Sequence, residues 1–526
     1  MSNPRLLPCD QAAIRGAAPV ASSAAGRSWV LAAAVLGSTL AYVDESVVNV
    51  ALPGIESDLH ATLPAMQWVV NAYTLCMSAL LLVGGATADQ FGRRRIFLIG
   101  VLLFALASLG CGLAPEVPVL IAGRALQGIG AALLVPCALA LIGAAYGEQE
   151  RGAAIGIWSG ASAIAAGAAP LLGGTLLDHV SWRAIFLINP IIAIPTVWIA
   201  LRYVPESRDP AAAGTALDWR GALLAFSGLA LLVYALIAAA ARGWGDARVI
   251  AGLSAGCIGL VAFVFAEQRS RAPMMPLQLF RIRTFSGINL LTLLLYGALG
   301  GAFFFLPFLL IQAQGRSATA AGAIYLPFTL VLGVLSRWSG GLMDRFGARG
   351  PLIIGPVLVA VGFALLATRD ARYATVLIAM TVLGLGMAIT IAPLTTAVLN
   401  AVPAQRTGVA SGINNAVASV GSLLMIALLG TVALGTFDRS LDRHLAGAES
   451  SPALAQAVES ARGGFVIPAL PESLSGAERE QARAIIASAL GDTVRLALWI
   501  ACALSLACAL VSALMLGAAS GASPGS

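Results

Sequence analysis

Long apolar segments follow one another through almost the whole chain, and they constrain its fold more than any other feature. A single helix needs about 20 apolar residues to cross the hydrocarbon core of a bilayer. Fourteen segments of suitable length fall near residues 29–52, 66–87, 96–114, 118–142, 153–177, 184–204, 220–241, 248–266, 285–311, 318–342, 351–368, 373–398, 408–436 and 493–517. Backbone polar groups in a bilayer must be satisfied within the segment, which favours helices. The sequence therefore predicts an all-α polytopic membrane protein with 14 transmembrane helices.

The composition agrees with this prediction and argues against other classes of protein. The chain is 59% hydrophobic and 11% charged, whereas soluble domains carry about 25% charged residues. Its net charge of +6 comes from arginines in loops, so it does not indicate a nucleic-acid partner. The chain shows no metal-ligand spacing of His, Cys and Asp, no phosphate-binding loop and no nucleophile elbow. We therefore expect no enzyme activity and no metal.

The arginines also predict the orientation of the chain in the membrane. They concentrate in four loops, at 87–95, 200–220, 266–284 and 337–350. By the positive-inside rule, these loops and both termini lie in the cytoplasm. Residues 1–28 lack an apolar core and are expected to form a cytoplasmic tail rather than a signal peptide. The long outer loop 437–492 is polar, and Ser475 with Glu478 forms a capping-box pattern that predicts a short helix there.

An internal repeat divides the chain into two halves. The run Gly85-Ala-Thr-Ala-Asp89-Gln-Phe91-Gly92 follows the second segment, and Gly340-Gly-Leu-Met-Asp344-Arg-Phe346-Gly347 follows the tenth, 255 residues later. Parallel repeats of this kind indicate two half-transporters related by an axis along the membrane normal. The expected organisation is a tail (1–28), a six-helix bundle (29–204), a linker with two extra transmembrane helices (205–284), a second six-helix bundle including the outer loop (285–517) and a C-terminal tail (518–526).

Two adjacent carboxylates, Asp44 and Glu45, lie inside the first apolar segment. An ionised carboxylate at that depth costs several kcal/mol unless it faces water, a partner charge or a proton carrier. Asn49 stands four residues after Glu45, so a helix brings its amide beside that carboxyl. The pair is either structural, packed against another helix, or a proton or cation site. The rest of the chain favours the second interpretation.

A lone arginine, Arg124, lies inside the fourth segment in the run Arg124-Ala-Leu-Gln127-Gly128. Its guanidinium group stays charged and demands a carboxylate, a carbonyl or water. Asp44 and Glu45 are the only other charges deep in the N-terminal half. We expect Arg124 to tune this acidic pair, the alternative being an arginine bound only to backbone carbonyls.

The loop after the second segment resembles a motif of the major facilitator superfamily. The family's loop between helices two and three reads G-x-x-x-D-x-x-G-R-[KR]-[KR], and the matching residues are Gly85, Asp89, Gly92, Arg93, Arg94 and Arg95. The resemblance implies that this loop acts as a gate. The second copy keeps Asp344 but has Ala348 in place of the first arginine, so its gate is expected to be weaker.

Other runs are similar to the superfamily's exporters. Arg124 begins an R-x-x-x-G pattern that is associated with proton transfer in related transporters. The fifth segment ends in Pro170-Leu-Leu-Gly173-Gly174 and contains Gly156, which resembles the antiporter motif, although Ala165 and Ala169 replace two of its usual glycines.

The first segment is similar to one branch of the superfamily in particular. Asp44-Glu-Ser-Val-Val-Asn49-Val-Ala-Leu-Pro53 resembles the helix-one motif D-x-T-[IV]-V-N-V-A-L-P of the fourteen-helix drug:proton antiporters, the EmrB/QacA-like multidrug efflux transporters. Asp44 matches the family's acidic position and is expected to be essential. Glu45 is an added acid and is expected to set charge selectivity.

The resemblance implies proton-coupled efflux of drugs or toxic organic compounds, cationic or amphipathic, across the cytoplasmic membrane by alternating access. The alternatives are an exporter of one dedicated metabolite and a proton-coupled importer. A non-transporting sensor or lipid-modifying enzyme is a further class, which the absence of a catalytic motif disfavours.

The expected partners are a small-molecule substrate, protons and the lipid bilayer, with no nucleic acid. A periplasmic adaptor is neither required nor excluded by the sequence. No cofactor is expected, because the proton gradient supplies the energy. Polar and aromatic residues at mid-span positions are the predicted lining of a substrate cavity: Gln67, Asn71, Gln127, Asn289, Tyr296 and Tyr325.

Overall fold

The computed structural model describes residues 24–209, 217–270, 273–368, 373–403, 406–446, 451–468, 470–471 and 474–516, with the backbone alone at 24–25, 148–149 and 336–346. This part of the chain consists of helices and their connections and contains no strand. Fourteen of the helices are long and apolar enough to cross a membrane. The predicted fold class and number of transmembrane helices are therefore confirmed.

The spanning helices follow one another with short connections. In chain order the helices are α2 (Ala24–Asp58), α3 (Leu63–Phe91), α4 (Arg93–Gly112), α5 (Val117–Ala145), α6 (Glu148–His179), α7 (Trp182–Tyr203), α8 (Trp219–Arg242), α9 (Ala247–Arg269), η2 (Leu277–Arg281), α10 (Arg283–Phe308), η3 (Leu309–Ala313), α11 (Ala318–Ala323), α12 (Tyr325–Phe346), α13 (Arg349–Leu366), α14 (Tyr373–Asn400), α15 (Thr407–Ala446), α16 (Pro452–Glu459) and α17 (Gly476–Met515).

Short polar side chains begin several of these helices. Ser181 accepts a hydrogen bond from the Arg183 amide at the start of α7, and Asp218 accepts one from the Gly221 amide at the start of α8. Each bond satisfies a first-turn amide that has no partner inside the helix. The capping box at Ser475 is confirmed, but the helix that begins there is not short, because it continues through a membrane span to Met515.

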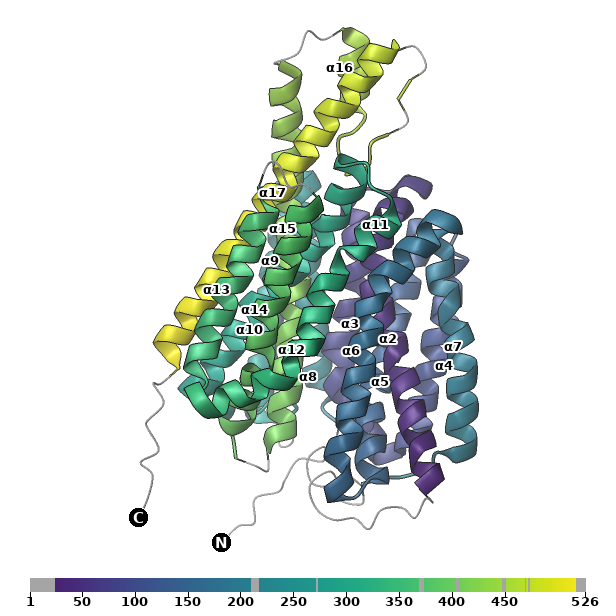
Figure 1. The fold of residues 1–526 in the computed structure, drawn as a ribbon, viewed down its shortest axis with the longest axis vertical. Helices are drawn as coiled ribbons and strands as arrows, with labels where there is room; N and C mark the ends of the chain where they lie inside the picture. The colour runs from purple at the N-terminus through teal and green to yellow at the C-terminus, as the bar shows by residue number, and fades with distance from the viewer. Residues whose placement is uncertain are drawn as a thin grey trace.

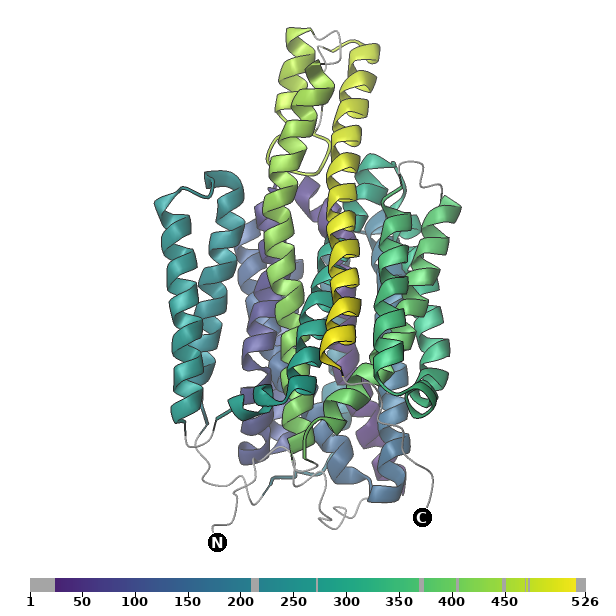
Figure 2. The same ribbon diagram turned by 90° about the vertical axis from the view of Figure 1, so that its left-hand side faces the viewer.

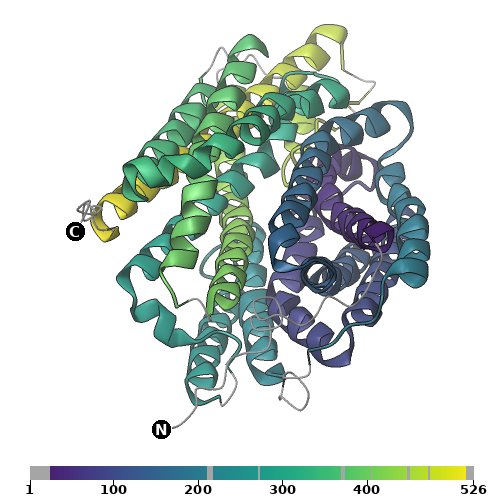
Figure 3. The same cartoon turned by 60° about the horizontal axis from the view of Figure 1, so that its bottom comes forward.

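The helices form two halves. Helices α2–α7 pack together as the N-terminal half, and α10–α17 pack together as the C-terminal half. Seen from below in Figure 3, the purple-to-blue N-terminal half and the green-to-yellow C-terminal half lie side by side. The halves meet mainly along two seams, where α3 contacts α15 and where α6 contacts α11 and α12, and α2 also contacts α10 and α11.

The two ends of the bundle differ. In Figure 1 the first residues of α2 and the last residues of α17 lie at the same end, which we call the terminal end. At the opposite end α15 and α17 protrude beyond the other helices and carry α16, so we call it the hairpin end. Each of these two helices has 40 residues, or about 60 Å of helix, twice the hydrocarbon thickness of a bilayer.

The repeated loops make equivalent turns at the terminal end. The first joins α3 to α4 through Gly92, with φ of 113°, and the second joins α12 to α13 through Gly347, with φ of 66°. These positive φ values are accessible to glycine at little steric cost, so both copies of the motif use their last glycine for the turn. Asp344 of the second copy lies outside the residues whose side chains are described.

The two helices between the halves, α8 and α9, stand outside the twelve-helix core (Figure 2). They pack against each other, and α8 also contacts α3 and α15. Leu229 and Val233 of α8 form an apolar cluster with Leu75 of α3 and Leu423 of α15. The inserted pair therefore covers one of the two seams between the halves.

Candidate functional site

Asp44 lies in the middle of α2 and is completely buried. Its carboxylate forms an ion pair with Arg124 of α5. Its Oδ1 atom accepts hydrogen bonds from Gln127 Nε2 at 3.0 Å and from Asn189 Nδ2 of α7 at 2.8 Å. A buried carboxylate is stable only when it is paired and hydrogen-bonded, and this one has both kinds of partner. Arg124, which we expected to lie near the acidic pair, contacts Asp44 directly.

Arg124 is fixed from several sides. Besides Asp44, its Nε donates to the Val69 carbonyl at 3.0 Å and a terminal nitrogen donates to Gln127 Oε1 at 2.9 Å. The Tyr73 ring lies 4.4 Å from the guanidinium carbon, at cation–π distance. The Tyr73 hydroxyl in turn donates to the Ala41 carbonyl at 3.2 Å, one turn before Asp44. Helices α2, α3 and α5 are therefore held together around one buried charge pair.

Two residues of this network were not predicted from the sequence. Asn189 also donates to Ser108 Oγ at 2.9 Å, and Ser108 donates to the Phe186 carbonyl at 2.8 Å. Both side chains are buried. Asn189 belongs to the run Trp182-Arg-Ala-Ile-Phe-Leu-Ile-Asn189-Pro. Its polar side chain in an otherwise apolar segment was a visible signal of a buried polar contact, whereas nothing in the sequence singled out Ser108.

Glu45 differs from its neighbour because it is exposed. Glu56 follows Glu45 by eleven residues, which make three full helical turns plus about 20°. The two side chains therefore lie on the same face of α2. Glu56 contacts residues of the C-terminal half, including the Phe465 amide, so this face points toward the other half. Asn49 was expected beside the Glu45 carboxyl, but its Nδ2 donates to the Glu45 backbone carbonyl at 3.3 Å.

The run that resembles the antiporter motif lies at the second seam. A Cβ atom on Gly174 would stand 2.1 Å from the Ala318 carbonyl oxygen of α11, and one on Gly173 would stand 2.4 Å from a methyl carbon of Val47. Gly322 of α11 approaches the Pro170 carbonyl of α6 equally closely. Gly156, nearer the terminal end, has no such neighbour within 4 Å. The close packing is therefore confined to the hairpin-end part of α6.

An acidic side chain that the sequence did not single out joins the halves at the same seam. Asp178, at the end of α6, accepts hydrogen bonds from the Ala318 amide at 3.0 Å and from the Thr319 amide at 2.7 Å. It also accepts one from the Thr319 hydroxyl at 2.6 Å. Both helix dipole and hydrogen bonding favour a carboxylate at the first turn of a helix, so Asp178 fastens α6 to α11.

The predicted gating loop is held within the N-terminal half. Asp89 is buried and forms an ion pair with Arg93 at 2.8 Å. The linker after α7 closes over the loop, because Glu206 accepts hydrogen bonds from the amides of Arg94 and Arg95 at 3.1 and 3.2 Å. Glu206 was not among the predicted residues. Near Gly85 the helices also pack closely, since a Cβ on Gly84 would meet the Ala132 carbonyl.

The residues predicted to line a cavity lie in different parts of the structure. Gln127 belongs to the Asp44 network, and Gln67 Nε2 donates to the Ile426 carbonyl across the first seam at 2.6 Å. Asn71 is buried and neither of its amide atoms has a partner. In the C-terminal half, Asn289 accepts from Asn414 at 3.3 Å. Tyr325 packs edge-on against Phe303, and Tyr296 lies partly exposed on α10.

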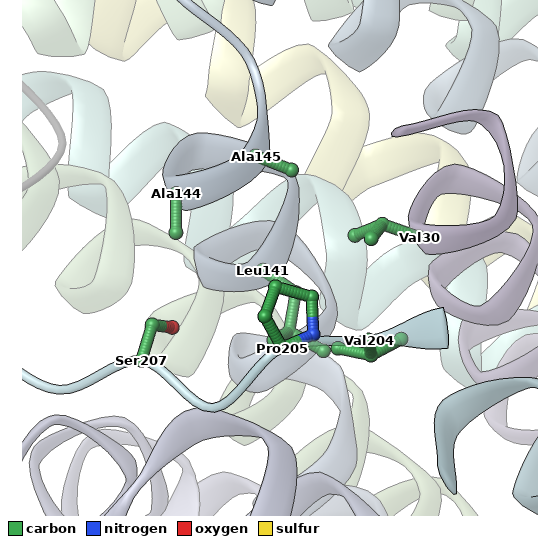
Figure 4. A pocket seen from close by; sticks show the side chains of 7 residues that line it. All are labelled: Val30, Leu141, Ala144, Ala145, Val204, Pro205 and Ser207. Carbon is green, nitrogen blue, oxygen red and sulfur yellow. The ribbon is translucent and has the colours of Figure 1, made fainter. Parts of the chain in front are cut away.

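A small pocket lies away from these charges, at the terminal end of the N-terminal half (Figure 4). Val30 of α2, Leu141 of α5 and Pro205 after α7 line it, and none of its lining residues is charged. Within the described residues no three His, Cys, Asp or Glu side chains gather as a metal site requires.

Comparison with known proteins identifies relatives that align with about four fifths of the chain. The chain is 36% identical over 424 residues to the multidrug resistance protein Stp of Mycobacterium tuberculosis, covering 80% of this chain and 79% of that protein. It is 34% identical over 416 residues to the tetracenomycin C resistance and export protein of Streptomyces glaucescens, covering 78% and 77%. It is 33% identical over 422 residues to the multidrug efflux pump LfrA of Mycolicibacterium smegmatis, covering 79% and 83%.

Solved structures share the fold. A bacterial homologue of the human lysosomal transporter Spinster, in an inward-facing conformation, matches with a TM-score of 0.63 and 18% identity over 93% of this chain and 98% of that one. The xylose transporter XylE of E. coli matches with a TM-score of 0.56 and 14% identity over 94% and 97%. The family model described as Major Facilitator Superfamily matches residues 34–426. The chain therefore belongs to the major facilitator superfamily.

Proposed function

We propose that the protein exports drugs or toxic organic compounds, cationic or amphipathic, across the cytoplasmic membrane in exchange for protons. The observation that carries the proposal is the pair of carboxylates on α2. Asp44 is held by Arg124 in the buried network, and Glu45 is exposed on the face of α2 toward the other half. The resistance and efflux names of three relatives, each covering more than three quarters of this chain, support the same activity.

The two carboxylates have different roles in this proposal. Glu45 attracts a cationic group, because it offers a negative charge that no side chain of the described residues pairs. Asp44 carries the transported proton. Paired with Arg124, it is ionised in the present arrangement, and protonation weakens that pair and so favours the alternate arrangement of the helices. Because the two carboxylates are adjacent, protonation of Asp44 leaves the positive charge of Arg124 uncompensated near Glu45 and so weakens the attraction of a cationic substrate, which is the basis of antiport.

The orientation follows from the arginine-rich loops. In the proposal the terminal end faces the cytoplasm with both termini, and the hairpin end faces outward. Contacts between the halves support a state closed at the hairpin end, since Asp178 joins α6 to α11 there. The cytoplasmic part of α6 is open by comparison. A Cβ atom added to Gly152, Gly156 or Gly160 would have no neighbouring atom within 4 Å.

An exporter of one dedicated metabolite is the second candidate. Two relatives favour it: the tetracenomycin C resistance and export protein, and a cephamycin export protein of Amycolatopsis lactamdurans that is 36% identical over 427 residues. Both candidates use the same coupling site, and they differ in the range of compounds transported.

Purified protein in proteoliposomes tests the proposal. With an acidic lumen, molecules whose terminal end faces the bath should accumulate the cationic dye ethidium inside the vesicles, and collapsing the pH gradient should release it. Protein carrying Asp44→Asn and Glu45→Gln together should show neither dye accumulation nor dye-dependent proton efflux. Gradient-driven accumulation by that double variant, with proton flux intact, would overturn the coupling mechanism. A panel of toxic compounds on cells with and without the protein then separates a multidrug exporter from a single-compound exporter.

A further inference from the structure

The segment between α16 and α17 returns to the hairpin end of the bundle and lies between the two halves. We call residues 463–467 the strap. Phe465 is 1% exposed and packs against rings of the C-terminal half. Its ring centroid lies 5.8 Å from that of Phe305, 6.0 Å from that of Phe308 and 5.2 Å from that of Phe437. The Ile467 amide donates to Gln312 Oε1 at 3.3 Å. The strap is thus anchored in the C-terminal half.

The strap is also bound to the N-terminal half. The Phe465 amide donates to Glu56 Oε1 of α2 at 2.6 Å, and the Leu63 amide of α3 donates to the Gly463 carbonyl at 3.1 Å. A Cβ on Gly464 would lie 2.8 Å from Glu56 Oε1, so glycine allows the strap to approach the carboxyl. Any movement that separates the halves at the hairpin end must break the contacts of the strap with at least one of them.

Glu56 is an unusual partner for the strap. It is 2% exposed, and among the described residues no basic side chain forms an ion pair with it. Its Oε2 atom is buried without a hydrogen-bond partner. A buried ionised carboxylate without a counter-charge is strongly disfavoured. A neutral carboxyl fits the same position better, with Oε1 accepting the Phe465 amide and the proton on Oε2.

The charged groups around Glu56 are engaged elsewhere. Asp58, two residues later on α2, pairs with Arg183 of α7. Arg462, just before the strap, pairs with Asp438 and Asp442 of α15 and with Glu459 of α16. His60 lies exposed in the turn after α2. The contacts from α3 and η3 come from the Leu63 amide and the neutral Gln312 side chain. No charge on these elements therefore compensates an ionised Glu56.

We propose that Glu56 is a proton-binding site that controls the strap. The neutral carboxyl is buried when the strap lies between the halves, and the ionised carboxylate is stable only when the strap has moved away and water reaches it. The proton comes from water at the hairpin end and returns to it. Closure of the hairpin end therefore requires proton binding first. This step concerns the strap alone and does not depend on the proposed function.

Hydrogen exchange of the full-length protein in lipid nanodiscs tests the site. Exchange at the strap is followed by mass spectrometry on peptides covering 461–468 between pH 5 and pH 9, and each rate is divided by the intrinsic rate at that pH. In the wild type, protection of the strap should fall as the pH rises, approaching about tenfold per pH unit for one linked proton. Glu56→Gln should keep the strap protected across the range. Glu480→Gln, an exposed acid on α17, should behave like the wild type.

Three results overturn the proposal. A flat corrected profile in the wild type shows that no proton controls the strap. The same pH dependence in Glu56→Gln and the wild type assigns the control to another group. Loss of protection at every pH in Glu56→Gln, with α4 still protected, shows that the negative charge itself holds the strap. A flat wild-type profile overturns the proposal without the variant, so the proposal stays falsifiable if Glu56→Gln fails to fold. The test requires no transport activity.

Discussion

Asp44 and Glu45 are adjacent on α2, yet their carboxylates lie in different surroundings. Asp44 is 0% exposed and forms an ion pair with Arg124, whereas Glu45 is exposed on the face of α2 toward the other half. Consecutive residues of a helix point about 100° apart, so one turn of α2 places one acid inside the N-terminal half and the other on its surface. The protein's own cation neutralises the first charge, and the second remains available to solvent or substrate.

Replacing Asp44 by Asn should abolish proton-driven export of every substrate. It should also destabilise the protein by about 3–5 kcal/mol, because Arg124 is left buried without its counter-charge. Thermal unfolding and ethidium transport in proteoliposomes measure the two effects. Adding Arg124→Gln should restore part of the stability and none of the transport. Normal proton-coupled export by Asp44→Asn would show that this carboxyl does not carry the proton.

Replacing Glu45 by Gln should change selectivity rather than stability. The side chain is exposed and its carboxylate forms no ion pair among the described residues, so the expected change in the free energy of unfolding is within about 0.5 kcal/mol. Export of divalent organic cations should weaken more than export of monovalent ones, because a second positive charge loses its partner. The ratio of KM values for a monocationic and a dicationic dye measures this. An equal rise for both would argue against a role in charge selectivity.

The charge pair could be predicted from the sequence because so few charges lie deep in the N-terminal half. Once Arg124 is placed in a span, Asp44 and Glu45 are its only possible acidic partners there, and the structure selects Asp44. Ser108 and Asn189 could not be placed in this network, because their contact depends on how α4 and α7 pack. Polar residues of this type are common in membrane helices, where many bond their own backbone.

The hairpin end was the part least visible in the sequence. Hydropathy locates where a helix leaves the membrane but not where the helix ends. We expected α15 to end near residue 436, but it continues to Ala446. We expected α17 to begin near residue 493, but it begins at Gly476. Glu56 resembled an ordinary acid near a helix end. Its burial depends on the strap, which is more than 400 residues away in the sequence.

The two glycines of the antiporter-like run should respond differently to the same substitution. Gly174→Ala places a methyl group against the Ala318 carbonyl, and overpacking of this kind costs about 1–3 kcal/mol. It should weaken closure at the hairpin end and reduce the transport rate by about tenfold. Gly156→Ala, on the same helix but with open space around it, should be nearly neutral. Equal effects of the two substitutions on transport and on the melting temperature would refute this account of the seam.

Asp89→Asn should slow transport while leaving substrate binding nearly unchanged. The substitution removes the ion pair with Arg93 in the loop at the terminal end, whereas Asp44 lies in the middle of α2, so it alters the loop and not the acidic pair. Transport rates and equilibrium dye binding measure the two properties separately. Arg95→Gln, which changes an exposed charge of the same loop, serves as the control and should have a small effect. Lost binding with a normal rate would instead make the loop part of the binding site.

The inserted helices α8 and α9 are expected to hold no residue essential for transport, although α8 supports the seam that it covers. Leu223→Trp, at a side chain that is 67% exposed, should be tolerated because the larger ring faces outward from the helices. Val233→Trp should destabilise the protein by about 1–3 kcal/mol, since Val233 is 0% exposed and packs in the cluster with Leu75 and Leu423. Transport per folded molecule, with folded protein measured by fluorescence-detected size exclusion, should stay near the wild-type value for Leu223→Trp. Complete loss of transport by Leu223→Trp at normal expression would show that the inserted pair takes part in the transport cycle.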